Sequence, residues 1–77
     1  MFVIYGRENC NWCSKAEILL ESLGKDYRYI DINKDERSRA YLQAEGHNTV
    51  PQIYANGSHI GGYIELEKMM ETNNDES

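Results

Sequence analysis

The sequence FVIYGRENCNWC, residues 2–13, decides the fold of this chain, because a polar turn joins a short apolar run to the two cysteines of the protein. Phe2–Tyr5 forms a continuous run, as in a strand that is covered on both faces. Cys10 and Cys13 follow at Cys-x-x-Cys spacing, just before a segment of helical periodicity. Thiols at this spacing can form a short-range disulfide, and a thiol at a helix start can become a good nucleophile. The stretch therefore predicts a strand, a turn and a helix that support reversible thiol–disulfide chemistry.

Outward from this stretch, apolar periodicity and turn residues predict the other elements. Apolar side chains recur at helical spacing over residues 12–23, and Gly24 is well placed to end that helix. A polar second helix opens at Asn33 and ends at Gly46, and a last helix begins at Tyr63. Runs rich in β-branched and aromatic residues predict the further strands 27–32, 52–55 and 58–60.

The expected order of elements is β-α-β-α-β-β-α. A right-handed βαβ crossover makes the first two strands parallel, whereas Asn56-Gly57 is a strong signal for a two-residue hairpin and an antiparallel pair. These rules predict an α/β fold in which a four-stranded mixed sheet is flanked by three helices. The apolar faces expected on the three helices are Ala16, Leu19, Leu20 and Leu23; Ala40, Tyr41 and Ala44; and Tyr63, Leu66, Met69 and Met70.

Length and composition indicate one small domain, residues 1–71, followed by a flexible acidic tail, residues 72–77. The formal net charge is −5 and the cationic residues are spread among acids, which argues against a nucleic-acid-binding surface. No apolar run reaches the length of a signal peptide or a membrane span. We therefore expect a cytoplasmic monomer that binds neither nucleic acid nor membrane. In that compartment a Cys-x-x-Cys pair is more typical of catalysis or metal binding than of a structural disulfide.

The two cysteines are expected to differ in reactivity. Cys10 lies at the helix start, where unpaired N–H groups and the helix dipole favour a thiolate, and Arg7 could add a positive charge. Cys13 lies one turn further in and should be shielded. We therefore predict that Cys10 is the nucleophile and that Cys13 attacks the mixed disulfide on Cys10 to release the substrate.

Other interpretations of these residues stay open at this point. The cysteines could be inert core residues, and a zinc site would need four ligands, for which His47 and His59 lack the paired spacing. We expect no metal. Trp12 could be a platform for a peptide or thiol substrate, or it could cap the edge of the core. Gly61-Gly62 could be a simple turn, or its N–H groups at a helix start could receive a carboxylate.

Three motifs, taken together and in order, resemble those of the glutaredoxins. Cys10-x-x-Cys13 follows the first strand, Thr49-Val50-Pro51 precedes the third, and residues 58–62, SHIGG, precede the last helix. The spacing matches along nearly the whole chain, and the short length is similar to that of the compact glutaredoxins of bacteria and phages. The resemblance implies a thioredoxin-like fold, supports Cys10 as nucleophile and Cys13 as resolving thiol, and implies glutathione as co-substrate.

The resemblance also implies a glutathione site. The family's proline after Thr-Val is cis, so Pro51 would be cis, and Val50 would offer its backbone to glutathione as an added strand. Arg7 stands where the family usually has a lysine that meets a glutathione carboxylate, and Arg39 could reach the glycyl carboxylate. The start of the last helix holds the γ-glutamyl end. The residues assigned to glutathione in this way are Arg7, Trp12, Thr49, Val50, Pro51, Gly62 and Tyr63.

The sequence departs from the family's pattern in two places. The common motif is Cys-Pro-Tyr-Cys, whereas here Asn11 stands for the proline and Trp12 for the tyrosine. After the double glycine the family often has an acidic residue that clasps the γ-glutamyl amine. That position is Ile64 here and Glu65 comes one later, so glutathione would be held less tightly or by Glu65 in a shifted pose.

The resemblance implies a glutathione-dependent dithiol–disulfide oxidoreductase. Its substrates would be protein disulfides and glutathione mixed disulfides, and it could supply electrons to a ribonucleotide reductase. The altered acidic position favours a variant that thioredoxin reductase recharges, whereas Arg7 and Thr49 oppose that variant. Some glutaredoxins without the active-site proline bind a 2Fe–2S cluster between two monomers, so Asn11 also leaves open a non-enzymatic, cluster-bridged dimer.

Overall fold

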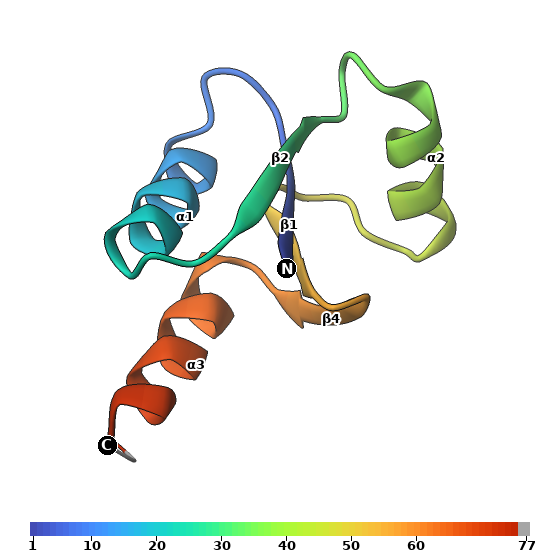
Figure 1. The fold of residues 1–77 in the computed structure, drawn as a ribbon. Coiled ribbons are helices and arrows are strands. Elements are labelled where there is room, and N and C mark those ends of the chain that lie inside the picture. Colours follow the sequence, from blue (N-terminus) through green and yellow to red (C-terminus); the bar gives the residue numbers. More distant parts are fainter. Residues whose placement is uncertain (76–77) are drawn as a thin grey trace.

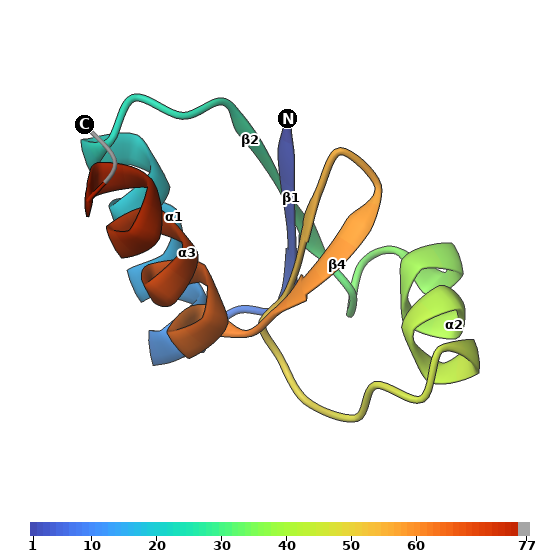
Figure 2. The same cartoon turned by 90° about the horizontal axis from the view of Figure 1, so that it is seen from below.

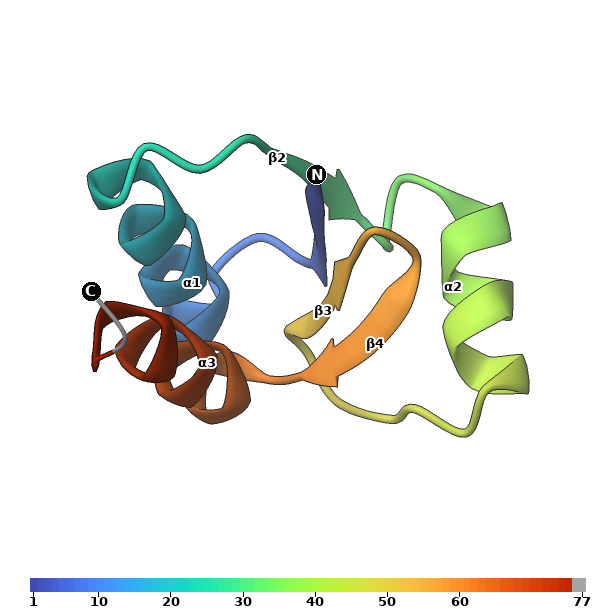
Figure 3. The ribbon, with the colours of Figure 1, turned by 60° about the horizontal axis from the view of Figure 1, so that its bottom comes forward.

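The structure, a computed structural model, describes residues 1–75 and contains one four-stranded sheet and three helices (Figure 1). In chain order the elements are β1 (Phe2–Gly6), α1 (Asn11–Ser22), β2 (Tyr27–Asp31), α2 (Glu36–Ala44), β3 (Gln52–Ala55), β4 (Ser58–Gly61) and α3 (Tyr63–Asp75). The strand order is β2-β1-β3-β4, in which β1 and β2 are parallel and the other neighbours are antiparallel. Helices α1 and α3 cover one face of the sheet and α2 covers the other (Figures 2 and 3). The predicted α/β fold with a mixed sheet is confirmed.

Strand β1 lies in the middle of the sheet and pairs along its length with both β2 and β3. Successive side chains of a strand point to opposite faces. Ile4 is therefore fully buried on the face covered by α1 and α3, whereas Tyr5 lies on the α2 side, with its ring centroid 6.2 Å from that of Tyr41. A run covered on both faces explains why the sequence shows no polar alternation here.

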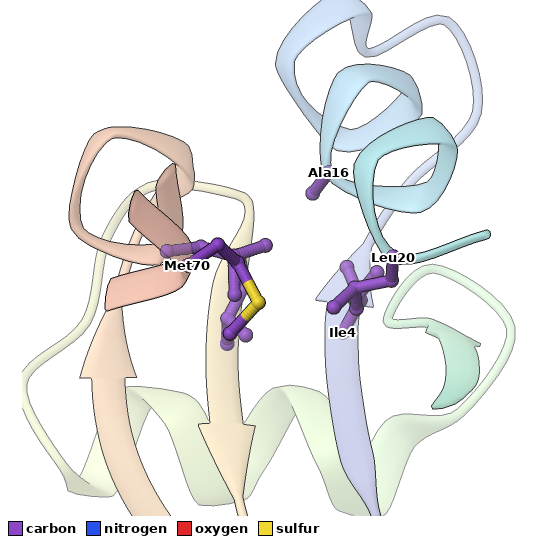
Figure 4. Close-up of a cluster of buried hydrophobic side chains, with 6 residues drawn as sticks. Ile4, Ala16, Leu20 and Met70 are labelled. Carbon is purple, nitrogen blue, oxygen red and sulfur yellow. The ribbon is translucent and has the colours of Figure 1, made fainter. Parts of the chain in front are cut away.

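The core fills the space between the sheet and the pair α1 and α3 (Figure 4). Side chains from β1, α1, β3 and α3 meet there. The buried cluster consists of Ile4, Ala16, Leu20, Ile53, Leu66 and Met70. The apolar faces predicted for the first and last helices therefore do pack against the sheet. Leu23 is the exception, because it is the C-cap residue of α1 and is 37% exposed.

Helix α2 begins three residues later than predicted, at Glu36 instead of Asn33. The reason is Asp35, which adopts extended backbone dihedrals and caps the helix. Its carboxylate accepts hydrogen bonds from the N–H of Arg37 and from the N–H and hydroxyl of Ser38, at 3.2, 3.4 and 2.9 Å. A side chain that satisfies these first donors fixes the helix start.

The predicted apolar face of α2 is wrong. Ala40, Tyr41 and Ala44 are exposed, and Leu42 is the buried residue of this helix. Leu42 presents a larger apolar side chain than either alanine, so turning it toward the sheet removes more apolar surface from water. The Tyr41 ring instead lies at the rim, with its centroid 5.9 Å from that of Tyr54.

The predicted turns are confirmed where the chain needs positive φ. Asn56 and Gly57 have φ of 51° and 86°, the signature of a tight hairpin between β3 and β4. The Asn56 side-chain oxygen also accepts a 2.7 Å hydrogen bond from the amino group of Met1.

Helix α3 ends at Asp75, so it extends into residues 72–77, which the sequence predicts to be a tail. Residues 76 and 77 of that segment lie outside the described part of the chain. The division into a domain and a flexible tail stays a prediction. Within residues 1–75, no helix has the length and apolar character required to cross a membrane.

Candidate active site

The two cysteines lie at the start of α1, after the turn that follows β1. A disulfide joins them, and their Cα atoms are 5.2 Å apart. Cys10 has extended dihedrals and caps α1, and its Sγ accepts a 3.2 Å hydrogen bond from the N–H of Cys13. Cys10 is half-buried, whereas Cys13 is fully buried. The sequence predicts an exposed cysteine at the helix start and a shielded one a turn further in; the structure encloses Cys13 accordingly, whereas Cys10 is only partly exposed. Their chemical roles stay a prediction.

The absence of a side chain at Gly6 leaves space for the sulfur of Cys13. A Cβ at Gly6 would lie 2.9 Å from Cys13 Sγ and 2.5 Å from the Tyr29 hydroxyl oxygen. That hydroxyl donates a 2.9 Å hydrogen bond to the carbonyl of Arg7, and burial raises its pKa. Tyr29 of β2 therefore holds the turn that leads to the cysteines, and sequence reasoning did not identify this role of Gly6 or Tyr29.

A cavity of about 430 Å³ opens beside the cysteines. The N-terminal ends of α1 and α3 and the segment before β3 lie at the same end of the sheet, which explains how residues far apart in the sequence meet there (Figures 2 and 3). All residues that the sequence assigned to glutathione line this cavity except Arg7. They are Trp12, Thr49, Val50, Pro51, Gly62 and Tyr63. Neither cysteine belongs to its lining, although Trp12 lies between them in the sequence.

Two features of this cavity concern the alternatives left open by the sequence. The Val50–Pro51 peptide bond is cis, as the resemblance implied. The Trp12 ring is 49% exposed and packs against Tyr63, with centroids 5.6 Å apart, while Lys15 Nζ lies 4.6 Å from the centre of the indole. The indole is thus an exposed cavity wall that packs on α3, which suits a platform better than a cap on the core.

A second cavity, of about 240 Å³, lies on the other side of the same segment and shares Thr49 and Val50 with the first. Arg7 and Arg39 both line it, although they come from the β1–α1 turn and from α2. Arginine can bind a carboxylate through paired hydrogen bonds, so this cavity has the residues that a carboxylate site would need. The structure therefore brings Arg7 next to the predicted site rather than into the first cavity.

The start of α3 is already occupied by a carboxylate of the chain itself. Glu65 Oε1 accepts a 2.7 Å hydrogen bond from the N–H of Gly62, and this bond lowers the pKa of Glu65. The side chain lies so close to Gly61 that a Cβ there would be 2.7 Å from Glu65 Cγ. Of the two sequence alternatives for Gly61-Gly62, the carboxylate receptor is therefore realised internally. Ile64, in the position that is often acidic in the family, is 45% exposed.

The histidines behave as expected in part. His59 is exposed in β4 and His47 lies after α2, but their rings stack with centroids 4.3 Å apart and both line the larger cavity. His59 also pairs with the buried side chain of Gln52, a residue that the sequence did not single out. Among residues 1–75 the structure contains no group of three or more His, Cys, Asp or Glu side chains that could hold a metal ion.

Comparisons with known proteins agree with this geometry. The glutaredoxin family's sequence profile matches residues 2–60. Glutaredoxin 1 of Salmonella typhimurium is 38% identical, over 92% of this chain and 91% of its own. The structure of reduced Escherichia coli glutaredoxin, 34% identical, superposes with a TM-score of 0.79 over 96% of both chains. A buckwheat glutaredoxin–glutathione complex, 29% identical, has a TM-score of 0.79 over 94% of this chain and 69% of that one.

The match covers the strands, the helix that carries the cysteines, and the segment that contains the cis proline, so the fold is thioredoxin-like as the resemblance implied. Two cysteines at the start of α1, one accessible and one enclosed, are joined as a redox-active pair. The chain belongs to the glutaredoxin family and is a thiol–disulfide oxidoreductase.

Proposed function

We propose that this glutaredoxin uses glutathione to reduce protein disulfides and glutathione mixed disulfides. The observation that carries the proposal is the pair of cavities around Thr49 and Val50. The larger one is bounded by the aromatic rings of Trp12 and Tyr63, and the smaller one is lined by Arg7 and Arg39. An extended tripeptide with a carboxylate at each end fits this division, because its backbone can pair with the segment between the cavities while an arginine receives one carboxylate.

The proposed pose assigns a role to each part of the site. The backbone of Val50 pairs with the cysteinyl unit, and Arg7 and Arg39 receive the glycyl carboxylate. Gly62 and Tyr63 receive the γ-glutamyl end. The buckwheat relative was solved as a glutaredoxin–glutathione complex, which supports a glutathione site on this fold.

The proposed reaction with a glutathione mixed disulfide uses Cys10 alone. Its thiolate attacks the glutathione sulfur of the mixed disulfide and forms a Cys10–glutathione disulfide. The bond between glutathione and the substrate breaks, and the substrate protein leaves as a thiolate that takes up a proton. A second glutathione thiolate then attacks the sulfur of the bound glutathione, which releases Cys10 as a thiolate and gives oxidised glutathione. The N–H of Cys13, which contacts Cys10 Sγ in the disulfide, is placed to stabilise that thiolate.

With a protein disulfide the proposed reaction needs both cysteines. Cys10 forms a mixed disulfide with the substrate, Cys13 attacks Cys10 Sγ, and the reduced substrate leaves while the Cys10–Cys13 disulfide forms. Two glutathione molecules then reduce that disulfide. We further propose that the protein acts as a cytoplasmic monomer and that it can donate electrons to a ribonucleotide reductase.

A test of glutathione dependence starts from the oxidised protein. We expect millimolar glutathione, coupled to glutathione reductase and NADPH, to reduce it rapidly, and thioredoxin reductase with NADPH to be ineffective. The Arg7→Ala variant should need a several-fold higher glutathione concentration for its half-maximal rate. Lys25→Ala removes one positive charge from the exposed loop between α1 and β2 and serves as the control. Rapid reduction by thioredoxin reductase together with no reduction by glutathione would overturn the proposal.

One observation favours the second candidate, a dithiol donor that thioredoxin reductase recharges. Because Glu65 already takes the N–H of Gly62, a γ-glutamyl carboxylate arriving there would meet a like charge. Removing that charge in Glu65→Ala should increase the rate with glutathione if glutathione is the natural reductant and Glu65 merely weakens its binding. An unchanged, negligible rate in this variant would favour the second candidate.

A further inference from the structure

Gln52, the first residue of β3, is a polar residue with a buried side chain and is only 8% exposed. Its side-chain amide lies between two parts of the chain. Gln52 Nε2 donates hydrogen bonds to the carbonyl oxygen of Thr49 at 2.9 Å and to the Thr49 hydroxyl at 3.3 Å. Gln52 Oε1 lies 2.7 Å from Nε2 of His59 on β4. A buried amide with this many partners is costly to misplace, because an unpaired polar group in the interior loses its bonds to water.

The partners fix which way the amide points. A backbone carbonyl can only accept, so the NH₂ group of Gln52 must face Thr49 and the oxygen must face His59. That oxygen can only accept, so His59 Nε2 carries the proton. Thr49 therefore sets the orientation of the Gln52 amide, His59 binds the amide oxygen, and Gln52 ties Thr49 to β4 at the end of the sheet.

The imidazole that begins this chain of bonds is itself held by aromatic packing. His47 stacks on His59 at 4.3 Å with an interplanar angle of 28°, and the Tyr54 ring centroid lies 5.0 Å from that of His59. The stack connects the loop after α2 to β4. His47, Tyr54 and Gln52 thus converge on the imidazole of His59 from different places in the sequence.

The segment that Gln52 ties down separates the two cavities. Thr49 and Val50 line both of them and Pro51 lines the larger one, yet Thr49 is exposed and the segment belongs to no helix or strand. A backbone that pairs with an extended substrate must present its N–H and carbonyl groups at fixed positions. A loop gains that rigidity only from tertiary bonds.

We propose that Gln52 is a positioning residue for the oxidoreductase reaction: its side chain, anchored to β4 by His59, holds Thr49–Pro51 in the geometry that receives the backbone of a peptide disulfide. The choice of glutathione as the test substrate rests on the function proposed above. Gln52 touches neither sulfur of the Cys10–Cys13 pair and moves no proton. Its effect is on where the substrate lies relative to Cys10.

The kinetic test compares two substrates on the fully reduced protein, followed by stopped flow. One peptide carries a mixed disulfide with glutathione, and the same peptide carries one with 2-mercaptoethanol, which has no backbone to pair. In Gln52→Leu we expect the rate with the glutathione adduct to fall about tenfold, as for the loss of one or two ordinary hydrogen bonds, and the rate with the other adduct to stay the same. Gln52→Glu keeps the acceptor for His59 but loses the donor to Thr49, so it should behave like Gln52→Leu. Ser58→Ala, on exposed β4, is the matched control.

A second variant isolates the anchoring role of His59. His59→Phe keeps an aromatic ring between His47 and Tyr54 but removes the Nε2 proton, so the amide oxygen of Gln52 loses its partner on β4. We expect a smaller loss, about threefold, confined to the glutathione adduct. Equal losses with both adducts in any of these variants would indicate general damage to the active site and would overturn the proposal.

A spectroscopic test does not depend on glutathione. Backbone ¹⁵N order parameters of Thr49 and Val50 should fall toward the values of flexible backbone, below about 0.6, in Gln52→Leu and stay high in Ser58→Ala. Unchanged order parameters in a folded Gln52→Leu protein would sink the positioning role, whatever the kinetics. A fall in order parameters, combined with a wild-type protein that does not distinguish the two adducts, would support the positioning role and instead refute glutathione as substrate.

Discussion

At the scale of single residues, Cys10 and Cys13 are separated by three positions yet have different surroundings. The first caps α1 at the rim of the molecule, and the second is fully enclosed beneath it. A nucleophile must meet a substrate, whereas a resolving thiol only has to reach its neighbour. The difference in burial therefore supports the same prediction as the helix-start argument from the sequence, with Cys10 as nucleophile and Cys13 as resolving thiol.

This difference predicts distinct outcomes for two substitutions. Cys10→Ser should abolish turnover with every substrate, because no other thiol is accessible. Cys13→Ser should stop the reduction of protein disulfides and spare the removal of glutathione from mixed disulfides, which needs one thiol. Both activities are measured by coupling to glutathione reductase and NADPH. If Cys13→Ser lost both activities while Cys10→Ser kept both, the roles would be reversed.

Gly6 provides a second prediction at this scale. The methyl group of Gly6→Ala would press on Cys13 Sγ and on the Tyr29 hydroxyl, so we expect a loss of about 1–3 kcal/mol in the free energy of unfolding, measured with urea. Combining Gly6→Ala with Tyr29→Phe removes the nearest contact and should recover part of that loss. Gly62→Ala is a suitable control, since its Cβ would meet no atom closer than 3.4 Å. A Gly6→Ala protein as stable as wild type would refute the close packing at this turn.

At the scale of elements, the three helices are held by different interactions. Helix α1 places Ala16 and Leu20 in the core. Helix α2 buries one residue, Leu42, and its first turn is held by hydrogen bonds to the capping carboxylate of Asp35. The two kinds of support respond to different perturbations. Removing core volume should affect α1, and acid should affect α2.

Leu20→Ala should therefore cost about 2–5 kcal/mol, the usual range for truncating a fully buried leucine. Ile18→Ala, two residues away on the same helix and 64% exposed, should change stability by less than about 0.5 kcal/mol. Urea unfolding of the reduced proteins provides the comparison. Similar losses in the two variants would mean that α1 does not pack as described.

The cap of α2 predicts a dependence on pH. Hydrogen bonds from the side chain and then the N–H of Ser38 lower the pKa of Asp35, so the folded protein favours the charged carboxylate. The stabilisation is present above about pH 4, where the unfolded chain also ionises, and it is lost as pH falls through the lower folded pKa. Asp35→Asn keeps a capping oxygen that does not titrate. The advantage of wild type over Asp35→Asn should shrink on acidification, and a constant gap in denaturant midpoint would contradict this account.

At the scale of the whole molecule, the net charge of −5 should act on encounters with substrates. A disulfide peptide rich in lysine should react several-fold more slowly at 0.15 M salt than at 0.01 M, because the screening length shortens from about 30 to about 8 Å. A glutamate-rich peptide should show the opposite trend, and an uncharged one little change. Identical salt profiles for all three peptides would show that charge does not steer association here.

The sequence predicted the order of strands and helices well, because each depends on local periodicity or on turn residues such as Asn56 and Gly57. Motifs with known spacing also pointed to residues that meet in the larger cavity, although Arg7 lines the smaller one instead. It failed for the buried face of α2, where a choice between Tyr41 and Leu42 depends on the shape of the sheet surface. The bond from Gln52 to His59 was equally out of reach, since a hydrogen bond between two strands depends on register and rotamers.

The central position of β1 affects how the chain can fold while it is being made. This strand is synthesised before its partner β3, which ends at Ala55, so one side of β1 stays without a neighbour until β3 has been made. Until then a nascent chain exposes an unpaired apolar strand, which is the kind of surface that chaperones bind and that promotes aggregation. Translation that stalls before β3 would leave a fragment in that condition.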